Sequence, residues 1–389
     1  MACRAAYTKP ASSKKAPDML PRRWMVEPLR LSRLSLRGFR NLELQSFEPG
    51  PRFNVVHGDN GQGKSNLLEA IDYTATLRSF RGANAQEMIA RGAETAELLA
   101  DVYAEPIPHL ARIQISNSAQ RSVQLDGKRP RSRSAYVGTI PLVLFHPGDM
   151  QLVAGSPELR RTFVDRLIEQ IDSVFASTAD AYERALRSRN RMLKAEPIDV
   201  HAVTAYDELL ASAGAVLGQA RRRLIDEIAP RVTAACADIG GEPARLAMRY
   251  EPRCEPSVDA LRAALRESLD RDRARGFTAE GPHADDIGFY LDDAPAKRYA
   301  SQGQQRSIVL ALKVAELAEL ERRSNKSPIL LLDDVSSELD RGRNKRLFEL
   351  LSSLAGQVFL TTTQPELILI ERDRRDFKVE RGVIRPSGQ

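Results

Sequence analysis

One glycine-rich stretch constrains the fold of this chain more than any other. Residues Gly58–Ser65 read Gly-Asp-Asn-Gly-Gln-Gly-Lys-Ser and fit the pattern G-x-x-x-x-G-K-[ST]. A short β-branched run, Phe53–Val56, precedes the stretch, and Asn66–Tyr73 follow it with apolar side chains at helical spacing. Strand, glycine loop and helix together predict a phosphate-binding loop, whose backbone N–H groups and helix dipole face an anion. The chain is therefore expected to contain a nucleotide-binding α/β domain.

Each residue of this loop has an expected role. The predicted nucleotide-binding residues are Gly58, Asp59, Asn60, Gly61, Gln62, Gly63, Lys64 and Ser65. The glycines let the backbone bend so that its N–H groups point inward. The Lys64 ammonium is expected to reach the β- and γ-phosphates of ATP, and the Ser65 hydroxyl to bind Mg²⁺.

Two carboxylates follow a second apolar run, Pro328–Leu332. Asp333 would lie at the carboxyl end of this strand, where open α/β sheets bind ligands, and is predicted to hold Mg²⁺ together with Ser65. Asp334, one residue later, is predicted to polarise a water aimed at the γ-phosphate. ATP and Mg²⁺ are thus the expected cofactors, and Lys64 and Asp334 the candidate catalytic residues.

The texture of the sequence changes along the chain. Residues 1–24 are rich in Lys, Arg, Pro and Ser, and predict a disordered basic tail. Residues 25–148 hold several strands with the phosphate loop and its helix, and strands alternate with helices in residues 277–389, which predicts two parts of one ATPase lobe with a largely parallel sheet. Between them, residues 149–276 are helix-rich and predict an inserted helical second lobe.

The charge is modestly basic. The 389 residues carry a formal charge of +6, which favours a polyanionic partner. Residues 121–133 and 182–194 hold local excesses of Arg and Lys. The first is either a solvated hairpin tip, turned at Asp126-Gly127, or an edge that contacts phosphates. The second is either a solvated helix face or a helix that faces DNA.

Composition excludes several classes of site. The three cysteines are scattered without a C-x-x-C pair, and the five histidines show no metal-ligand spacing. A disulfide framework and a zinc site are therefore not expected, and a cytoplasmic protein is. No apolar run approaches the ~18 to 20 residues of a membrane span. Heptads are not sustained, so a long coiled coil is not expected.

A further motif opens the helix that covers Ile308–Leu320. Its residues Ser301-Gln302-Gly303-Gln304 combine a serine hydroxyl and a glycine N–H at a helix start, which is either an ordinary N-cap or a second anion site. The stretch resembles the signature motif of ABC-type ATPases, whose heads pair around two ATP molecules. That resemblance implies that Ser301, Gly303 and Gln304 contact the nucleotide held by a second copy of the chain.

From about Leu29 onward the whole chain resembles the RecF family. Four segments carry the match: Gly58–Ser65 with Arg37–Asn41 upstream, Pro147–Asp165, Gly281–Asp286 followed by Ser301–Arg306, and Leu332–Asp340. The resemblance implies an ABC-type P-loop ATPase head with an inserted helical lobe, similar to SMC heads but without their long coiled coil. It also implies an ATP-dependent homodimer that binds single-stranded and gapped duplex DNA, hydrolyses ATP slowly, and acts with RecR and RecO to place RecA at gaps.

The chain departs from the family pattern at a few positions. Ala300 replaces the leucine that usually starts the ABC signature, Ala284 an arginine, and Gly148 an acidic residue. Asp334 replaces the glutamate of ABC transporters, and its shorter side chain predicts slow turnover. Alternatives are a non-hydrolysing ATP-gated DNA-binding module and another SMC-like ATPase head. A transporter ATPase subunit is disfavoured, because the long separation of Ser65 from Ser301 leaves room for an inserted domain.

Overall fold

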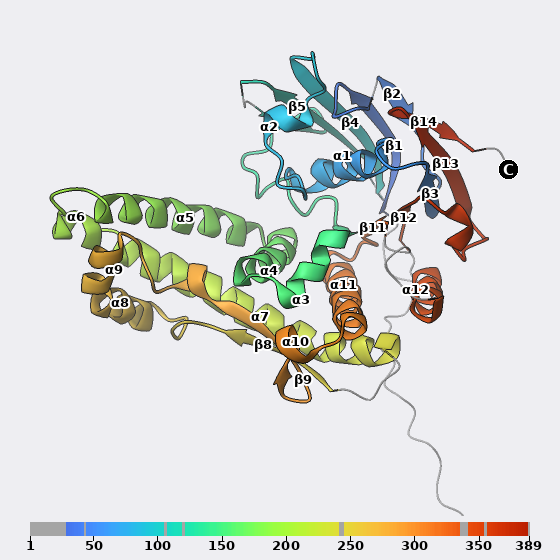
Figure 1. The fold of residues 1–389 in the computed structure, drawn as a ribbon. Coiled ribbons are helices and arrows are strands. Elements are labelled where there is room, and N and C mark those ends of the chain that lie inside the picture. The colour runs from blue at the N-terminus through green and yellow to red at the C-terminus, as the bar shows by residue number, and fades with distance from the viewer. Residues whose placement is uncertain are drawn as a thin grey trace, which may run out of the picture.

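The structure is a computed structural model and describes residues 29–42, 44–104, 107–118, 121–240, 245–334, 341–353 and 356–387. The predicted tail, residues 1–24, and part of the fourth family segment, residues 335–340, lie outside these ranges. Figure 1 shows an α/β head at one end of the molecule and a helical arm, built around α5 and α7, that extends away from it.

A central sheet of six strands positions the phosphate loop. Its order is β14 (Val383–Pro386), β13 (Arg374–Glu380), β3 (Phe53–His57), β12 (Val358–Thr362), β11 (Ile329–Asp333) and β7 (Leu142–Phe145). All neighbours pair in parallel except β14, which is antiparallel to β13. The largely parallel sheet predicted from strand–helix alternation is confirmed here. Strands β3, β12, β11 and β7 are apolar and buried because helices or strands cover both faces.

A second sheet of five strands is entirely antiparallel. Its order is β2 (Gln45–Phe47), β1 (Leu29–Arg37), β4 (Thr95–Ala104), β5 (His109–Ser116) and β6 (Arg121–Leu125). The alternating leucines of β1 face inward and pack with α1 (Lys64–Thr76), whose other apolar side chains reach the central sheet. The helix that follows the phosphate loop is therefore held between two sheets.

The arm and its base are mainly helical. Its helices are α3 (Gln151–Ala154), α4 (Pro157–Ile171), α5 (Ser173–Leu193), α6 (Val200–Thr204), α7 (Asp207–Gly240), α8 (Val258–Glu267) and α9 (Leu269–Arg275). At 34 residues α7 is about 50 Å long. It packs along α11 (Gln302–Ser324), so the arm and the head share one hydrophobic core.

A small sheet joins the arm to the second part of the head. It comprises β10 (Ala294–Pro295), β9 (Asp286–Leu291) and β8 (Leu246–Glu251). Strand β8 lies within the predicted helical lobe and was not expected from the sequence. It pairs with β9, which lies beyond the predicted end of that lobe at residue 276. The remaining elements are α2 (Ala85–Met88), α10 (Ala296–Tyr299), α12 (Arg341–Ser353), η1 (Pro147–Met150), η2 (Pro282–Ala284) and η4 (Pro365–Leu367).

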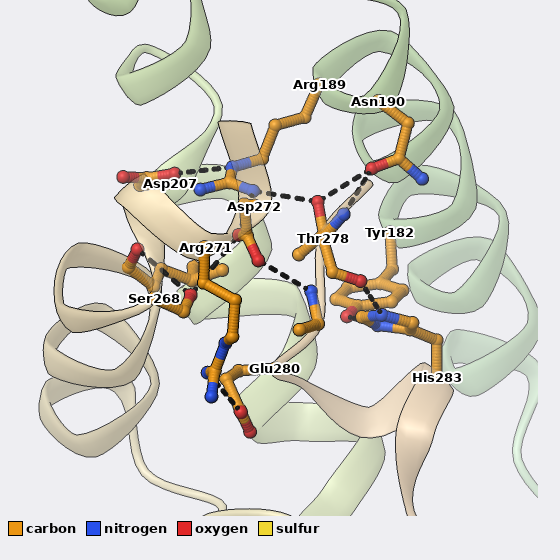
Figure 2. A network of polar contacts seen from close by, with 12 residues as sticks. Tyr182, Arg189, Asn190, Asp207, Ser268, Arg271, Asp272, Thr278, Glu280 and His283 are labelled. Carbon is orange, nitrogen blue, oxygen red and sulfur yellow. Dashed lines mark hydrogen bonds and ion pairs between the residues drawn. The ribbon is translucent and has the colours of Figure 1, made fainter. Parts of the chain in front are cut away.

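A buried arginine fixes the outer end of the arm (Figure 2). Arg189 of α5 is fully buried, and its guanidinium donates to Asp207 at 2.9 Å, to Asp272 at 2.8 Å and to Thr278 at 2.8 Å. These contacts tie α5 to α7, α9 and the loop before η2. Arg189 therefore cannot belong to the DNA-facing surface suggested for residues 182–194.

The remaining basic residues of that stretch share one face of α5. They are Arg184, Arg187, Arg191 and Lys194, all exposed and three or four positions apart. Arg187 also pairs with Glu183 at 2.8 Å.

Two of the family segments meet at the base of the arm. Arg160 of α4 forms a bidentate ion pair with Asp286, at 2.7 and 2.9 Å. Arg221 of α7 grips Asp165 in the same way, with both bonds at 2.8 Å, and donates to the Pro282 carbonyl. Bidentate arginine–carboxylate pairs fix orientation as well as distance. These ion pairs therefore hold α4 and α7 against the start of β9, the strand that precedes the signature motif. They join segment Pro147–Asp165 to segment Gly281–Asp286.

Candidate nucleotide-binding site

The loop between β3 and α1 has the backbone of an anion site. Gly58, Gly61 and Gly63 have φ values of 146°, 77° and 120°, which side-chain-bearing residues rarely adopt. A Cβ on Gly58 would also collide with the Val379 carbonyl oxygen of β13. The loop delivers its last residues into the first turn of α1, so the positive end of the helix faces the same space.

Lys64 folds back over this loop. Its ammonium is largely buried and donates to the carbonyl oxygens of Gly58 at 2.7 Å and Asp59 at 2.9 Å. Burial lowers the pKa of the Lys64 ammonium, and nearby carboxylates, Asp334 first, oppose that effect. A partly desolvated cation among loop N–H groups is the arrangement that a polyphosphate stabilises.

Ser65 and Asp333 meet as predicted, although they lie 268 positions apart. The Ser65 hydroxyl donates to Asp333 Oδ1 at 2.7 Å, and Thr361 on the neighbouring strand β12 donates to the same oxygen at 2.7 Å. A hydroxyl beside a carboxylate is an oxygen set that Mg²⁺ prefers, with waters and phosphates completing its shell. The residues present therefore fit a Mg²⁺ ion held between Ser65 and Asp333.

Asp334 ends the strand in a left-handed turn. Its φ is 51°, and its backbone N–H donates to Thr361 Oγ1 at 3.0 Å. Thr361 thus orients both carboxylate residues, and sequence analysis gives it no role. Its position, at the end of the strand that neighbours β11 in the parallel sheet, is the sequence feature from which this role could have been predicted.

The loop is braced from the C-terminal hairpin, which sequence analysis did not predict. The backbone N–H of Gly382 donates to the Gln62 carbonyl at 2.9 Å, and that of Arg381 to the Gln62 side chain at 2.6 Å. The Asn41 side chain donates to the same carbonyl at 3.1 Å. Gln62 is therefore a residue that holds the loop in shape, and the Arg381-Gly382 turn is the sequence signal for its partner.

Ser301, Gly303 and Gln304 lie at the start of α11, next to α10 (Figure 1). Ser301 is exposed, and its hydroxyl accepts from the Gln304 N–H at 3.2 Å, while the Gln304 side chain accepts from the Ser301 N–H at 2.9 Å. This capping box is the ordinary N-cap geometry. The capping box thus orders the start of the motif and leaves Ser301 exposed.

Comparison with known proteins shows the family to which this architecture belongs. Residues 30–374 match the family described as RecF/RecN/SMC N terminal domain. The DNA replication and repair protein RecF of Anaeromyxobacter sp. strain Fw109-5 is 40% identical over 370 residues, covering 92% of this chain and 99% of that protein. The chain belongs to the RecF family. The Myxococcus xanthus RecF is 38% identical over 351 residues, covering 87% of this chain and 92% of that protein.

Solved structures of RecF share the fold. The recombination mediator protein RecF-ATP in the RecFOR pathway superposes with a TM-score of 0.85 at 28% identity, covering 95% of this chain and all of that one. An Smc head domain from Pyrococcus furiosus has a TM-score of 0.54 at 17% identity, which shows a shared fold alone. The chain therefore has the fold of an ABC-type ATPase head with a helical second lobe. In its described part, no helix is both long and apolar enough to span a membrane.

Proposed function

We propose that this chain is a cytoplasmic DNA-binding protein of recombinational repair and replication that dimerises on ATP. One observation carries the proposal: Ser65 and Asp333, the candidate Mg²⁺ ligands, meet beside the phosphate loop, whereas Ser301 is exposed at the start of α11, with its hydroxyl in a capping box. A second copy, facing head to tail, would bring its Ser301–Gln304 onto the γ-phosphate held by the first copy. The ATP-bound solved relative supports ATP as the ligand.

The chain's own residues would bind ATP and turn it over as follows. The Lys64 ammonium exchanges the carbonyl oxygens of Gly58 and Asp59 for the β- and γ-phosphates. Ser65 and Asp333 would hold Mg²⁺, which when bound neutralises phosphate charge. Asp334 orients the attacking water and accepts its proton. Asp334 is one methylene shorter than glutamate, so slow hydrolysis is expected.

ATP would control pairing by mass action. The triphosphate adds contacts to Ser301–Gln304 that exist only in the dimer, so it shifts the monomer–dimer equilibrium. Hydrolysis removes the γ-phosphate, and with it these contacts. The inserted lobe, predicted to span residues 149–276, would then couple ATP binding to DNA binding.

Family membership supports the proposed partners. The relatives are named DNA replication and repair proteins, and we extend to this chain the binding of single-stranded and gapped duplex DNA. The exposed basic face of α5, Arg184 to Lys194, remains a predicted DNA contact. Work with RecR and RecO to place RecA at gaps rests on the resemblance.

The deciding experiment measures the mass of the full chain in solution against ATP concentration, with and without gapped DNA. A dimer that forms only with ATP and Mg²⁺ supports the proposal, and a monomer under all conditions contradicts it. Phosphate release, measured in parallel, separates the proposed slow ATPase from a non-hydrolysing module that uses ATP only to gate DNA binding.

A further inference from the structure

Four arginines gather where α1 ends and meets α4. They come from the loop after α1, from β6, from the segment after β6, and from α4: Arg78, Arg121, Arg133 and Arg166. Two of them belong to the basic stretch 121–133, which sequence analysis leaves as either a solvated hairpin tip or a phosphate-contacting edge.

These two side chains fold back onto the head. Arg121 Nη1 donates to the Leu77 carbonyl at 2.6 Å, just past the end of α1. Arg133 Nη2 donates to Glu169 of α4 at 2.7 Å. The hairpin thus supplies fixed guanidinium groups to an inner surface, in addition to the exposed side chains at its tip.

On its groove side the cluster carries unbalanced positive charge, because Arg78, Arg121 and Arg166 line the groove without a carboxylate. Glu169 is shared between Arg133 at 2.7 Å and Arg78 at 3.4 Å. Asp72, Asp149 and Glu316 line the adjoining small cavity together with Lys313, and burial raises the pKa of Asp72 to about 7, so that this group is only partly ionised at neutral pH. Burial lowers the pKa of Arg78, and the neighbouring charges of Arg133 and Arg166 lower it further despite Glu169.

The Arg166 side chain makes no hydrogen bond or close ion pair with any residue that the structure describes, although its charge acts on Asp72. Arg133 has two further nitrogens, Nε and Nη1, that are buried without a hydrogen-bond partner. Buried or half-buried guanidinium groups normally find acceptors, because leaving them unpaired costs stability. An anion in the adjoining space would satisfy them.

That space exists. An open groove of about 600 Å³ is lined by Arg78, Arg121 and Arg166 together with Ser79 and small or apolar residues, and its lining contains no carboxylate. A smaller cavity of about 170 Å³ adjoins it, shares Arg78 and Arg166, and reaches Arg133 and Glu169. Figure 1 shows α4 close to the loops between α1 and β7, on the side of the head that faces the arm.

We propose that this groove binds a backbone phosphate of DNA, with Arg166 as the central contact and Arg78 and Arg121 beside it. Guanidinium forks match phosphate oxygens, and an open groove suits a continuous polyanion; Lys128, Arg129 and Arg131, exposed beyond the far end of β6, add positive charge along the same hairpin sequence. This assignment rests on the proposed DNA binding and names the part of the head that performs it. It is separate from Gly58–Ser65, which binds the nucleotide.

Arg166→Gln tests the assignment with little risk to the fold, because Arg166 leaves no ion-pair partner behind. The full chain with ATP and Mg²⁺ is titrated with fluorescent gapped DNA at a series of salt concentrations. Each lost duplex-phosphate contact lowers the salt slope by about 0.9, so Arg166→Gln is expected to lose about one unit of slope and several-fold affinity. Arg166→Lys, which keeps the charge, should retain most of the slope.

Arg112→Gln is the matched control. Arg112 is exposed on β5 of the same sheet and is paired with Glu97 at 3.7 Å, away from the groove lining. Unchanged affinity and slope for Arg166→Gln, with DNA binding by the wild type, overturns the groove and leaves the proposed function standing. No DNA binding by the wild type overturns both. Arg166-dependent binding of inorganic phosphate without any effect on DNA would assign the groove to a free anion and also overturn the proposal.

Discussion

The two halves of the proposed nucleotide site differ in how they are held. The phosphate loop is braced from three directions, by Gly382 and Asn41 on Gln62 and by Asp333 on Ser65. The signature motif at Ser301 is exposed and closed by its own capping box. We call the phosphate loop the rigid half and the signature motif the self-capped half. The two differ in whether a second copy of the chain is required for them to contact nucleotide. In the proposed mechanism, the first would bind nucleotide alone, and the second would gain its ligand only on pairing.

Asp334→Asn should have the largest effect on this scheme. Asparagine tolerates the left-handed φ of 51° and keeps the backbone bond to Thr361, so ATP binding is expected to persist. Loss of the carboxylate should slow hydrolysis by about a hundredfold or more and prolong the ATP-bound dimer. Single-turnover phosphate release and dimer lifetime measure this. Hydrolysis at the wild-type rate would remove Asp334 from its role.

Lys64→Arg tests the rigid half. The Lys64 ammonium sits in a tight slot against the Gly58 and Asp59 carbonyls, and a planar guanidinium does not fit the same geometry. We expect ATP affinity and ATP-dependent dimerisation to weaken by about tenfold, equivalent to ~1.4 kcal/mol. Lys378→Arg, at an exposed position on β13, is the control. Wild-type dimerisation by Lys64→Arg would contradict the mechanism.

Ser301→Ala tests the self-capped half. Loss of an N-cap costs about 1 kcal/mol of stability on its own, so a control must share that cost. Ser257 caps α8 in the same way, accepting from the Ala260 N–H at 3.2 Å, and Ser257→Ala provides the control. We expect Ser301→Ala alone to weaken ATP-dependent dimerisation by about fivefold, a modest free-energy change, while monomeric ATP binding stays. Equal behaviour of the two variants would reduce Ser301 to a helix cap.

The sequence predicts the rigid half well because its signals are local. Strands β3 and β11 and helix α1 follow from short apolar patterns, and parallel topology alone brings Asp333 to Ser65. Contacts made by elements that the sequence did not predict could not be foreseen. One example is the hydrogen bond from Gly382, in the turn before β14, to the Gln62 carbonyl. The prediction for Arg189 failed for another reason. Its spacing from the neighbouring basic residues is that of an exposed helix face, but it is buried against Asp207 and Asp272, which are far away in the sequence.

Asp72→Asn probes the link between the halves and should affect pairing least. Asp72 lies on α1, the helix that the phosphate loop starts, and lines the small cavity together with Lys313 and Glu316 of α11, the helix that the signature motif starts. Its Oδ2 is buried without a hydrogen-bond partner. The two halves therefore share a polar contact region through the body of one chain.

The pH dependence of stability follows from this burial. Burial raises the folded-state pKa of Asp72 to about 7, against 3.8 for the free group, so the folded chain holds a proton that the unfolded chain has lost. Stability from this group is full below pH ~4 and falls by up to about 1.4 kcal/mol per pH unit until pH ~7. Asparagine cannot ionise, so Asp72→Asn should gain on the order of 2 kcal/mol over wild type between pH 5 and pH 8. Denaturant unfolding at the two pH values measures the gain. A difference between variant and wild type that does not change with pH would show that Asp72 stays ionised, and that the α1–α11 contact does not depend on its protonation.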